Sequence, residues 1–284
     1  MSVGNLLENW AEFRHFHPVD DKPHDPYKWA MSIDLDACTG CNACSIACYA
    51  ENNLPVVGRE KFQHGQVMHW MRIERYWDED GREFPDQGVQ FLPMMCQQCE
   101  AAPCETVCPV AATNHTSDGL NSQIYNRCIG SRYCSANCPF KVRYFNWYDY
   151  PTDDAVWPAE MTQQLNPDVS VRSKGVMEKC TFCVQRLHEA KSNAKSEGRI
   201  VREGEVQTAC QQSCPTGAIS FGNLVDVESK VHKQWQAQQV ELDKDKQTKD
   251  KGEERSELRG YRILEELRPY PSVMYLERVR ESAV

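Results

Sequence analysis

The residues of this chain most able to do chemistry are its fifteen cysteines, which lie in four tight groups. The groups are Cys38, Cys41, Cys44 and Cys48; Cys96, Cys99, Cys104 and Cys108; Cys128, Cys134 and Cys138; and Cys180, Cys183, Cys210 and Cys214. Thiolates are soft ligands, and side chains this close in sequence can converge on one metal centre. The sequence therefore predicts metal binding at all four groups.

The spacing within the groups favours iron–sulfur clusters. The first group places its cysteines at intervals of three, three and four residues, the run that bacterial ferredoxins use. In such a run the last cysteine serves the second cluster of a two-cluster unit, and inward-pointing backbone N–H groups hydrogen-bond the cluster sulfurs. Three groups end in Cys-Pro, at Pro109, Pro139 and Pro215. A proline there has no N–H to leave unpaired and has a fixed φ.

Two other classes of cysteine protein fit less well. A disulfide scaffold is disfavoured because the cysteine count is odd, the chain of 284 residues is long and the cysteines are clustered. Zinc sites also use Cys-x-x-Cys, but as two separated pairs rather than a run of four. A structural zinc protein stays an alternative, and analysis of metal and acid-labile sulfide discriminates it.

The third group carries a serine, Ser131, where the first group has its second cysteine, Cys41. A serine hydroxyl must lose its proton to bind iron, and iron in these clusters prefers thiolate. The sequence therefore predicts a three-iron cluster at this group. Two alternatives stay open: a serine-ligated [4Fe–4S] cluster, and a cluster whose fourth ligand comes from a distant side chain.

Composition excludes several classes of protein. The net charge of −9 and the 40% hydrophobic content are typical of an acidic globular protein. We expect no nucleic-acid partner, because nucleic-acid binders usually carry a basic balance. No segment approaches the roughly 20 apolar residues of a membrane span. Residues 1–21 contain neither a signal-peptide pattern nor a twin-arginine pair.

Short strands and helices must position the cysteines. Alternating apolar residues predict a strand over 31–36, with Met31, Ile33 and Leu35 facing inward and Ser32 outward. Further strands are predicted at 66–77, 89–92 and 122–126, with a hairpin turn at 80–81. A helix is predicted over 176–195, ending at Gly198. The repeated unit is a strand, a cysteine loop and a short helix.

The remaining segments allow more than one interpretation. Residues 1–30 are rich in aromatic residues, which predicts an extension packed on a partner or on the core. Metal binding by His15 and His17 is a less favoured interpretation of this segment. Residues 226–258 are strongly charged, which favours a solvated helix or a mobile segment. Residues 268–280 predict an extended arm that either embraces a partner or packs on its own core. Four residues after the third group either line a partner contact or, as we favour, counter the negative charge of the thiolates. They are Lys141, Arg143, Tyr144 and Trp147.

In the order and spacing of its cysteine groups, the chain resembles the four-cluster ferredoxin-like subunits of molybdopterin oxidoreductases and their quinone-linked relatives. The resemblance implies an α+β fold of two pseudo-repeated, two-cluster bacterial ferredoxin-like modules with inserted hairpins and N- and C-terminal extensions. Residues 1–30 would form the N-terminal extension, residues 31–222 the four-cluster core, and residues 223–284 a charged segment and C-terminal arm.

In that family the first group pairs with the fourth and the second with the third. The resemblance thus implies clusters held by Cys38, Cys41, Cys44 and Cys214; by Cys48, Cys180, Cys183 and Cys210; by Cys96, Cys99, Cys104 and Cys138; and by Cys108, Cys128 and Cys134. Ser131 would stand at the vacant corner of the last. The implied cofactors are three [4Fe–4S] clusters and one [3Fe–4S] cluster.

A closer resemblance is to the iron–sulfur portion of the B subunit of alternative complex III, a quinol-oxidising respiratory complex. It rests on the segments CTGCNACSIACYAENNLPVVG, MHWMRIERYW, CPVAATNH and CIGSRYCSANCPFKVRYFNW. In that subunit the iron–sulfur portion usually follows a large molybdopterin-like portion on one polypeptide, whereas here it stands alone.

These resemblances imply a non-catalytic electron-transfer subunit of an oxidoreductase complex. Its partners would be an integral-membrane quinone-binding subunit and a molybdopterin-type or multihaem cytochrome subunit. The chain would be membrane-associated only through these partners, either on the cytoplasmic side or co-exported with a partner. A stand-alone polyferredoxin carrier for a hydrogenase or formate dehydrogenase is the alternative, and it would purify without a membrane subunit.

Overall fold

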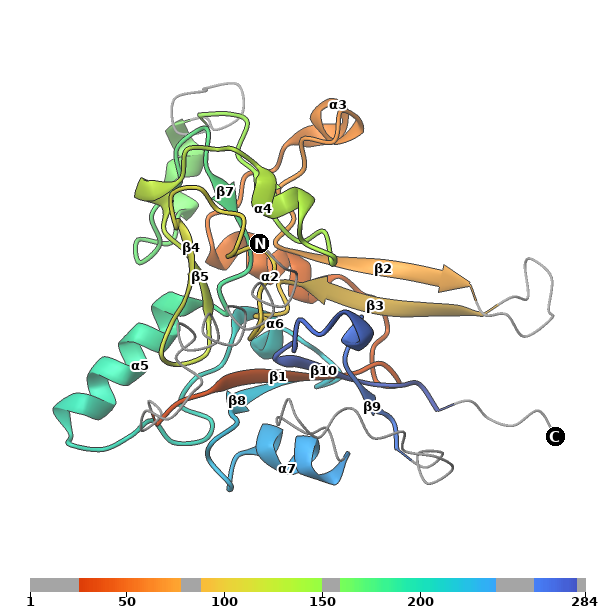
Figure 1. The fold of residues 1–284 in the computed structure, drawn as a ribbon. Helices are drawn as coiled ribbons and strands as arrows, with labels where there is room; N and C mark the ends of the chain where they lie inside the picture. Colours follow the sequence, from red (N-terminus) through yellow and green to blue (C-terminus); the bar gives the residue numbers. More distant parts are fainter. Residues whose placement is uncertain (1–25, 78–87, 150–158, 239–257, 280–284) are drawn as a thin grey trace, which may run out of the picture.

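A computed structural model describes residues 26–77, 88–149, 159–238 and 258–279. Its described part combines one four-stranded sheet, several two-stranded ribbons and short helices, an α+β arrangement (Figure 1). The predicted hairpin turn at 80–81 and both His15 and His17 lie outside the described residues.

The main sheet has the strand order β8 (Ile219–Asn223), β1 (Trp29–Asp34), β10 (Val273–Leu276) and β9 (Gly260–Tyr261). Strand β1 runs antiparallel to β8 and parallel to β10. Because β1 and β10 are inner strands, the sheet joins segments from both ends of the described chain (Figure 1).

Both faces of this sheet are covered. Helix α7 (Lys230–Ala237) packs Val231 and Trp235 against one face, beneath the sheet in Figure 1. The strand predicted over 31–36 is confirmed over 31–34, although it begins at Trp29 and ends before Leu35. Its predicted outward face is wrong. Ser32 is only 2% exposed, because α7 covers the side that the alternating pattern assigned to solvent.

A long hairpin extends away from the sheet (Figure 1). It consists of β2 (Met71–Trp77) and β3 (Val89–Met95), which pair antiparallel with Met71 opposite Met95. The two predicted strands are confirmed in this pairing, although β2 begins at Met71 and β3 continues to Met95. Strand β3 therefore leads directly into the second cysteine group at Cys96.

The remaining strands and turns are short. The ribbons are β4 (Thr113–His115) with β5 (Asn121–Gln123), and β6 (Tyr144–Phe145) with β7 (Met177–Glu178). The 3-10 turns are η2 (Tyr125–Arg127), η4 (Ala159–Gln164) and η6 (Glu265–Leu267). The predicted strand at 122–126 is wrong beyond Gln123, because η2 follows it.

Of the next five helices, all but the one at 58–63 begin beside a cysteine loop. They are α2 (Ala43–Glu51), α3 (Gly58–Gln63), α4 (Tyr133–Ala136), α5 (Val184–Ser196) and α6 (Ala209–Gln212). The predicted helix at 176–195 starts only at Val184, because β7 and a cysteine loop occupy the preceding residues. Its predicted end is confirmed, since Gly198 follows with a φ of 68°, a conformation that glycine adopts without strain.

The segment predicted as an extended arm packs on the chain's own core. Within it, β10 is an inner strand whose Val273 and Met274 have no exposed area. Ser272 donates its backbone N–H to the carbonyl of Gln97 and its hydroxyl to the carbonyl of Gln98. The C-terminal strand is therefore held to the second cysteine loop by two hydrogen bonds from Ser272.

Candidate iron–sulfur centres

All fifteen cysteines are free thiols in the structure. Electrostatic interactions divide them into four neighbourhoods, which we name the first to fourth thiol sets. The sets are Cys38, Cys41, Cys44 and Cys214; Cys48, Cys180, Cys183 and Cys210; Cys96, Cys99, Cys104 and Cys138; and Cys108, Cys128 and Cys134. These sets have the same members as the groups that the family resemblance implies, and their role as cluster ligands stays a prediction.

Burial sets the acidity of the inner thiols. Burial, reinforced by the nearby thiolates of Cys180, Cys183 and Cys210, raises the pKa of Cys48 well above that of a free thiol. Burial also raises the pKa of Cys99 in the third set, with further repulsion from Cys96. Thiolates crowded in this way need a positively charged centre between them, and binding such a centre releases their protons.

The loops have a backbone suited to turning sulfurs inward. The residue before the second ligand position has a positive φ in every loop: 68° at Gly40, 46° at Gln98, 72° at Gly130 and 56° at Phe182. A left-handed residue at this position reverses the chain within three residues. The loops around Gly40 and Gly130 also share the backbone conformation two residues later, where Asn42 and Arg132 both have a φ of 62°.

Backbone N–H groups point at the sulfurs. The donor–sulfur pairs are Ala112 to Cys108 at 3.2 Å, Met177 to Cys128 at 3.4 Å, Ala209 to Cys183 at 3.4 Å and Phe182 to Cys180 at 3.5 Å. The side-chain amide of Asn52 adds a bond of 3.5 Å to the sulfur of Cys48. Such donors stabilise thiolate sulfur, as they do around iron–sulfur clusters.

Cys108 and Cys214 share a distinct environment. Burial alone would raise the pKa of Cys108, but backbone N–H groups of Val110, Thr113 and Ala112 and the charge of Arg143 lower it. Burial likewise acts to raise the pKa of Cys214, but the Thr216 hydroxyl and the backbone N–H groups that follow it outweigh this effect. Each of these cysteines precedes a proline. Cys108 belongs to the fourth set and Cys214 to the first.

Electrostatic interactions between the sets indicate their order. Cys44 of the first set interacts with Cys210 of the second, and Cys180 of the second with Cys96 of the third. Arg143 connects the third and fourth sets, because its charge acts on Cys104 and on Cys134. The four sets therefore follow one another as a series.

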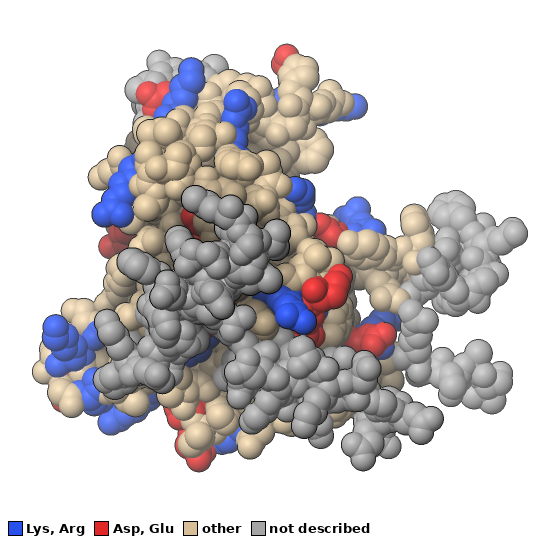
Figure 2. Space-filling view, in the orientation of Figure 1, with Lys and Arg blue, Asp and Glu red and all other residues tan. Residues whose placement is uncertain are grey.

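The outer ends of this series reach the surface. Cys41 in the first set and Ser131 beside the fourth are both exposed. Ile129 and Tyr133 flank Ser131 and are 66% and 58% exposed. On the face shown in Figure 2, basic and acidic side chains of described residues are interspersed, with uncharged areas between them.

The four residues singled out after the third group have different surroundings in the structure. Arg143 is only 4% exposed and counters the charge of the thiolates, which confirms the favoured interpretation for this residue. Lys141 donates to the carbonyl of Ala136, and the Tyr144 hydroxyl accepts from Arg72. Trp147 packs edge-on against the ring of Phe145, and the guanidinium group of Arg132 lies 4.9 Å from the centre of each ring.

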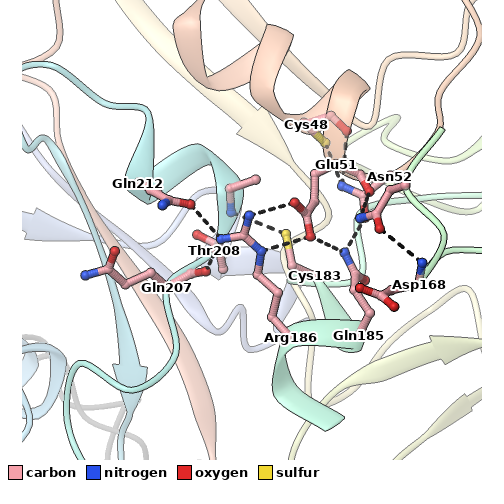
Figure 3. Close-up of polar contacts among 12 residues, drawn as sticks. Cys48, Glu51, Asn52, Asp168, Cys183, Gln185, Arg186, Gln207, Thr208 and Gln212 are labelled. Atoms are coloured by element: carbon pink, nitrogen blue, oxygen red, sulfur yellow. Dashed lines mark hydrogen bonds and ion pairs between the residues drawn. The ribbon is translucent and has the colours of Figure 1, made fainter. Parts of the chain in front are cut away.

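Sequence reasoning missed several charged and polar residues around the second and third sets. Arg186 forms a bidentate ion pair with Glu51, at 2.6 and 2.8 Å, next to Cys183 (Figure 3). Lys179 is fully buried, and its charge acts on Cys104. Asn52 and Arg186 lie four and three residues beyond a cysteine at a helix, a spacing that places side chains on one face and was a usable signal.

The thiols fit polynuclear iron–sulfur clusters better than single ions. Within the described ranges, no three His, Cys, Asp or Glu side chains are arranged around one metal ion. A zinc ion would draw four sulfurs to about 2.3 Å from one point. The backbone N–H donors aimed at the sulfurs are typical of iron–sulfur clusters. In its described part, the structure contains no helix of the length and apolar character needed to cross a membrane.

Comparison with known proteins agrees with this chemistry. The family model of a 4Fe–4S dicluster domain matches residues 37–112. The chain is 44% identical over 255 residues to the iron–sulfur cluster-binding subunit of menaquinone reductase from Nitratidesulfovibrio vulgaris, covering 88% of this chain and 89% of that subunit.

Two more distant relatives extend the comparison. The Hdr-like menaquinol oxidoreductase iron–sulfur subunit 1 of Archaeoglobus fulgidus is 34% identical over 224 residues, covering 72% of this chain and 74% of that subunit. The B polypeptide of polysulfide reductase from Wolinella succinogenes is 32% identical over 208 residues, with coverages of 72% and 82%. With its four thiol sets in an α+β fold, this protein belongs to the 4Fe–4S electron-transfer subunits of the molybdopterin oxidoreductase family.

Proposed function

We propose that this chain relays electrons through three [4Fe–4S] clusters and one [3Fe–4S] cluster in a respiratory complex. One end would face an integral-membrane quinone-binding subunit, and the other a molybdopterin-type or multihaem cytochrome subunit. The first, second and third thiol sets would each hold a four-iron cluster. The fourth set, with three thiols, would hold the three-iron cluster, and Ser131 would stand at its vacant corner.

The observation that carries this proposal is the serial order of the thiol sets. When bound, iron–sulfur clusters supply one-electron acceptors and donors at potentials that the protein sets. Cys44 and Cys210 bring the first and second sets together, and Cys180 and Cys96 do the same for the second and third. Burial of thiols in the second and third sets, at Cys48, Cys183 and Cys99, keeps water from the middle of the series.

We also propose that the sets belong to two ferredoxin-like modules. One would combine residues 38–48 with 180–214, and the other residues 96–108 with 128–138. Support comes from the matching backbone of the loops at Gly40 and Gly130, and from the shared environment of Cys108 and Cys214. Each module would then contribute one end of the series.

The fourth set is the proposed quinone-facing end. Ile129 and Tyr133 expose apolar surface on both sides of Ser131, as expected of a residue pair that a partner subunit covers. A three-iron centre has a potential suited to exchange with a quinone pool. The names of the relatives, which include a menaquinone reductase and a menaquinol oxidoreductase, support a quinone-linked complex. So does the likeness of four segments to the B subunit of alternative complex III.

Attachment to the membrane would come from the partner subunits. The chain itself would supply no substrate-binding residues, and the direction of electron flow would follow from the potentials of its partners. Polysulfide and selenate reductase subunits among the relatives support a complex whose substrate chemistry resides in another subunit.

Co-purification tests this proposal. An affinity-tagged chain, extracted in mild detergent, should co-purify with a membrane subunit. In that preparation added quinol should reduce the clusters, or added quinone should oxidise them. The paired substitution Ile129→Glu and Tyr133→Glu should release the membrane subunit while leaving iron content unchanged. Substitution of the similarly exposed Val225 and Val227 is the matched control. A chain that purifies as a monomer with no membrane subunit would instead indicate a free carrier.

A further inference from the structure

Arg143 is a buried cation without a carboxylate partner. Its side chain is almost fully enclosed, at 4% exposure for the residue. Its guanidinium group donates to three neutral oxygens: Thr113 Oγ1 at 3.2 Å, Gln123 Oε1 at 2.8 Å and Asn121 Oδ1 at 2.6 Å. Among the described residues no Asp or Glu pairs with it. These neutral contacts fix the position of the guanidinium group but leave its charge uncompensated.

The charges that face Arg143 are thiolates from two sets. It acts on Cys104 and Cys96 in the third set and on Cys134 in the fourth, to which it also donates a hydrogen bond. Its charge also lowers the pKa of Cys108 on the other side of the fourth set. Asn121, which accepts from Arg143, lies 3.9 Å from the sulfur of Cys104. Arg143 is therefore located at the junction of the two sets.

A second arginine beside a thiol set gives the contrast. Arg186 lies near Cys183 and Cys210, but Glu51 neutralises it through a bidentate pair (Figure 3). A neutral pair has a much weaker field at the sulfurs than a single charge at a similar distance. Arg143 alone of these two can act as a net charge on its neighbours.

We propose that Arg143 is a positioning residue whose single positive charge is shared by the clusters of the third and fourth sets and raises the reduction potential of both. The inference rests on the proposed function, because it takes these sets as cluster ligands. Reduction adds negative charge to a cluster, and a fixed cation in a buried site stabilises the reduced form. One residue thus keeps two neighbouring relay sites at matched, raised potentials, next to the quinone-facing end.

The test is a redox titration of the intact complex, followed by electron paramagnetic resonance. Arg143→Gln should lower the potentials of the three-iron signal and of one four-iron signal. We expect about a tenfold shift in each reduction equilibrium, which is about 59 mV for a one-electron step. Arg143→Lys retains the charge and should restore most of this shift. The double substitution Glu51→Gln with Arg186→Gln, which removes a neutral pair, should change the potentials far less.

A second variant tests the effect of the charge without replacing Arg143 itself. Gln123→Glu has nearly the same shape and places a carboxylate where Arg143 already donates at 2.8 Å. It should neutralise Arg143 and lower the same two potentials. If Arg143→Gln does not assemble its clusters, this variant decides the question alone. Iron and sulfide content is measured for every variant, so that potentials are compared only between fully loaded proteins.

Two results would overturn the inference. One is that fully loaded Gln123→Glu, and Arg143→Gln where it assembles, keep both potentials at the wild-type values. The other is that Arg143→Lys shifts them as much as Arg143→Gln, since charge would then not be the operative property. Failure of the proposed function looks different, because wild-type protein would then contain no iron–sulfur clusters at all.

Discussion

Ser131 occupies, in the third cysteine loop, the position that Cys41 occupies in the first. Each follows a glycine of left-handed φ, 72° at Gly130 and 68° at Gly40, and each precedes a residue with a φ of 62°. Both side chains are exposed, and a helix begins two residues later, α4 after Ser131 and α2 after Cys41. The loop geometry of a four-thiol set is therefore retained where the fourth thiol is absent.

Replacing this serine tests that geometry. Ser131→Cys should supply a fourth thiolate and convert the three-iron cluster to a four-iron cluster, because the loop already has the backbone of the first loop. Oxidised protein should lose its three-iron paramagnetic signal and gain about one iron atom per chain. Ser131→Ala is the control and should retain the signal. A three-iron signal that persists in Ser131→Cys would show that the position does not face the cluster.

Gly130 should be essential for the same loop. A side chain there requires a φ of +72° and places a Cβ against the carbonyl oxygen of Gly175 and 2.9 Å from the ring of Phe145. Gly130→Ala should therefore lose the three-iron signal while the four-iron signals remain. The matched control is Gly198→Ala, which has a similar φ of +68° in open space and carries only the backbone cost of about 1 kcal/mol. Equal cluster loss in both variants would contradict the steric argument.

The ion pair between Arg172 and Glu178 should be costly to break. The two side chains are 2% and 1% exposed and 2.9 Å apart, and Glu178 also accepts from Trp70 and Asn146. Glu178→Gln leaves the arginine charge buried, which should reduce the free energy of unfolding by about 3 kcal/mol. Thermal unfolding measures this as a lower midpoint. Lys233→Gln, in an exposed pair with Glu228, should leave the midpoint unchanged.

His69 should make stability depend on pH. Burial, with a contribution from the charge of Arg72, lowers the pKa of His69 in the folded protein. On acidification through about pH 6.5 the unfolded chain takes up a proton that the folded protein does not, so acid favours unfolding. Between pH 7.5 and 5.5 the midpoint of thermal unfolding should fall more in wild type than in His69→Gln. Parallel curves for the two proteins would refute this assignment.

The sequence was most informative where structure is local. In loops such as 38–44 the cysteines are only three residues apart, so their spacing alone predicts that they share one centre. The face of Ser32 was mispredicted because α7, about two hundred residues away, covers it. The spacing of Arg186 from Cys183 indicates that the two residues lie close together, but it does not indicate that Glu51, on another helix, neutralises the arginine. Which thiols share a set likewise depends on contacts between distant loops, and family resemblance rather than spacing supplied that grouping.

The central claim is that four serial thiol sets hold three four-iron clusters and one three-iron cluster. Its most direct test combines metal analysis with paramagnetic resonance on the oxidised, purified complex. We predict about fifteen iron atoms per chain, negligible zinc, and a three-iron signal of about one spin per chain. About sixteen iron atoms with no three-iron signal, or stoichiometric zinc, would contradict the account.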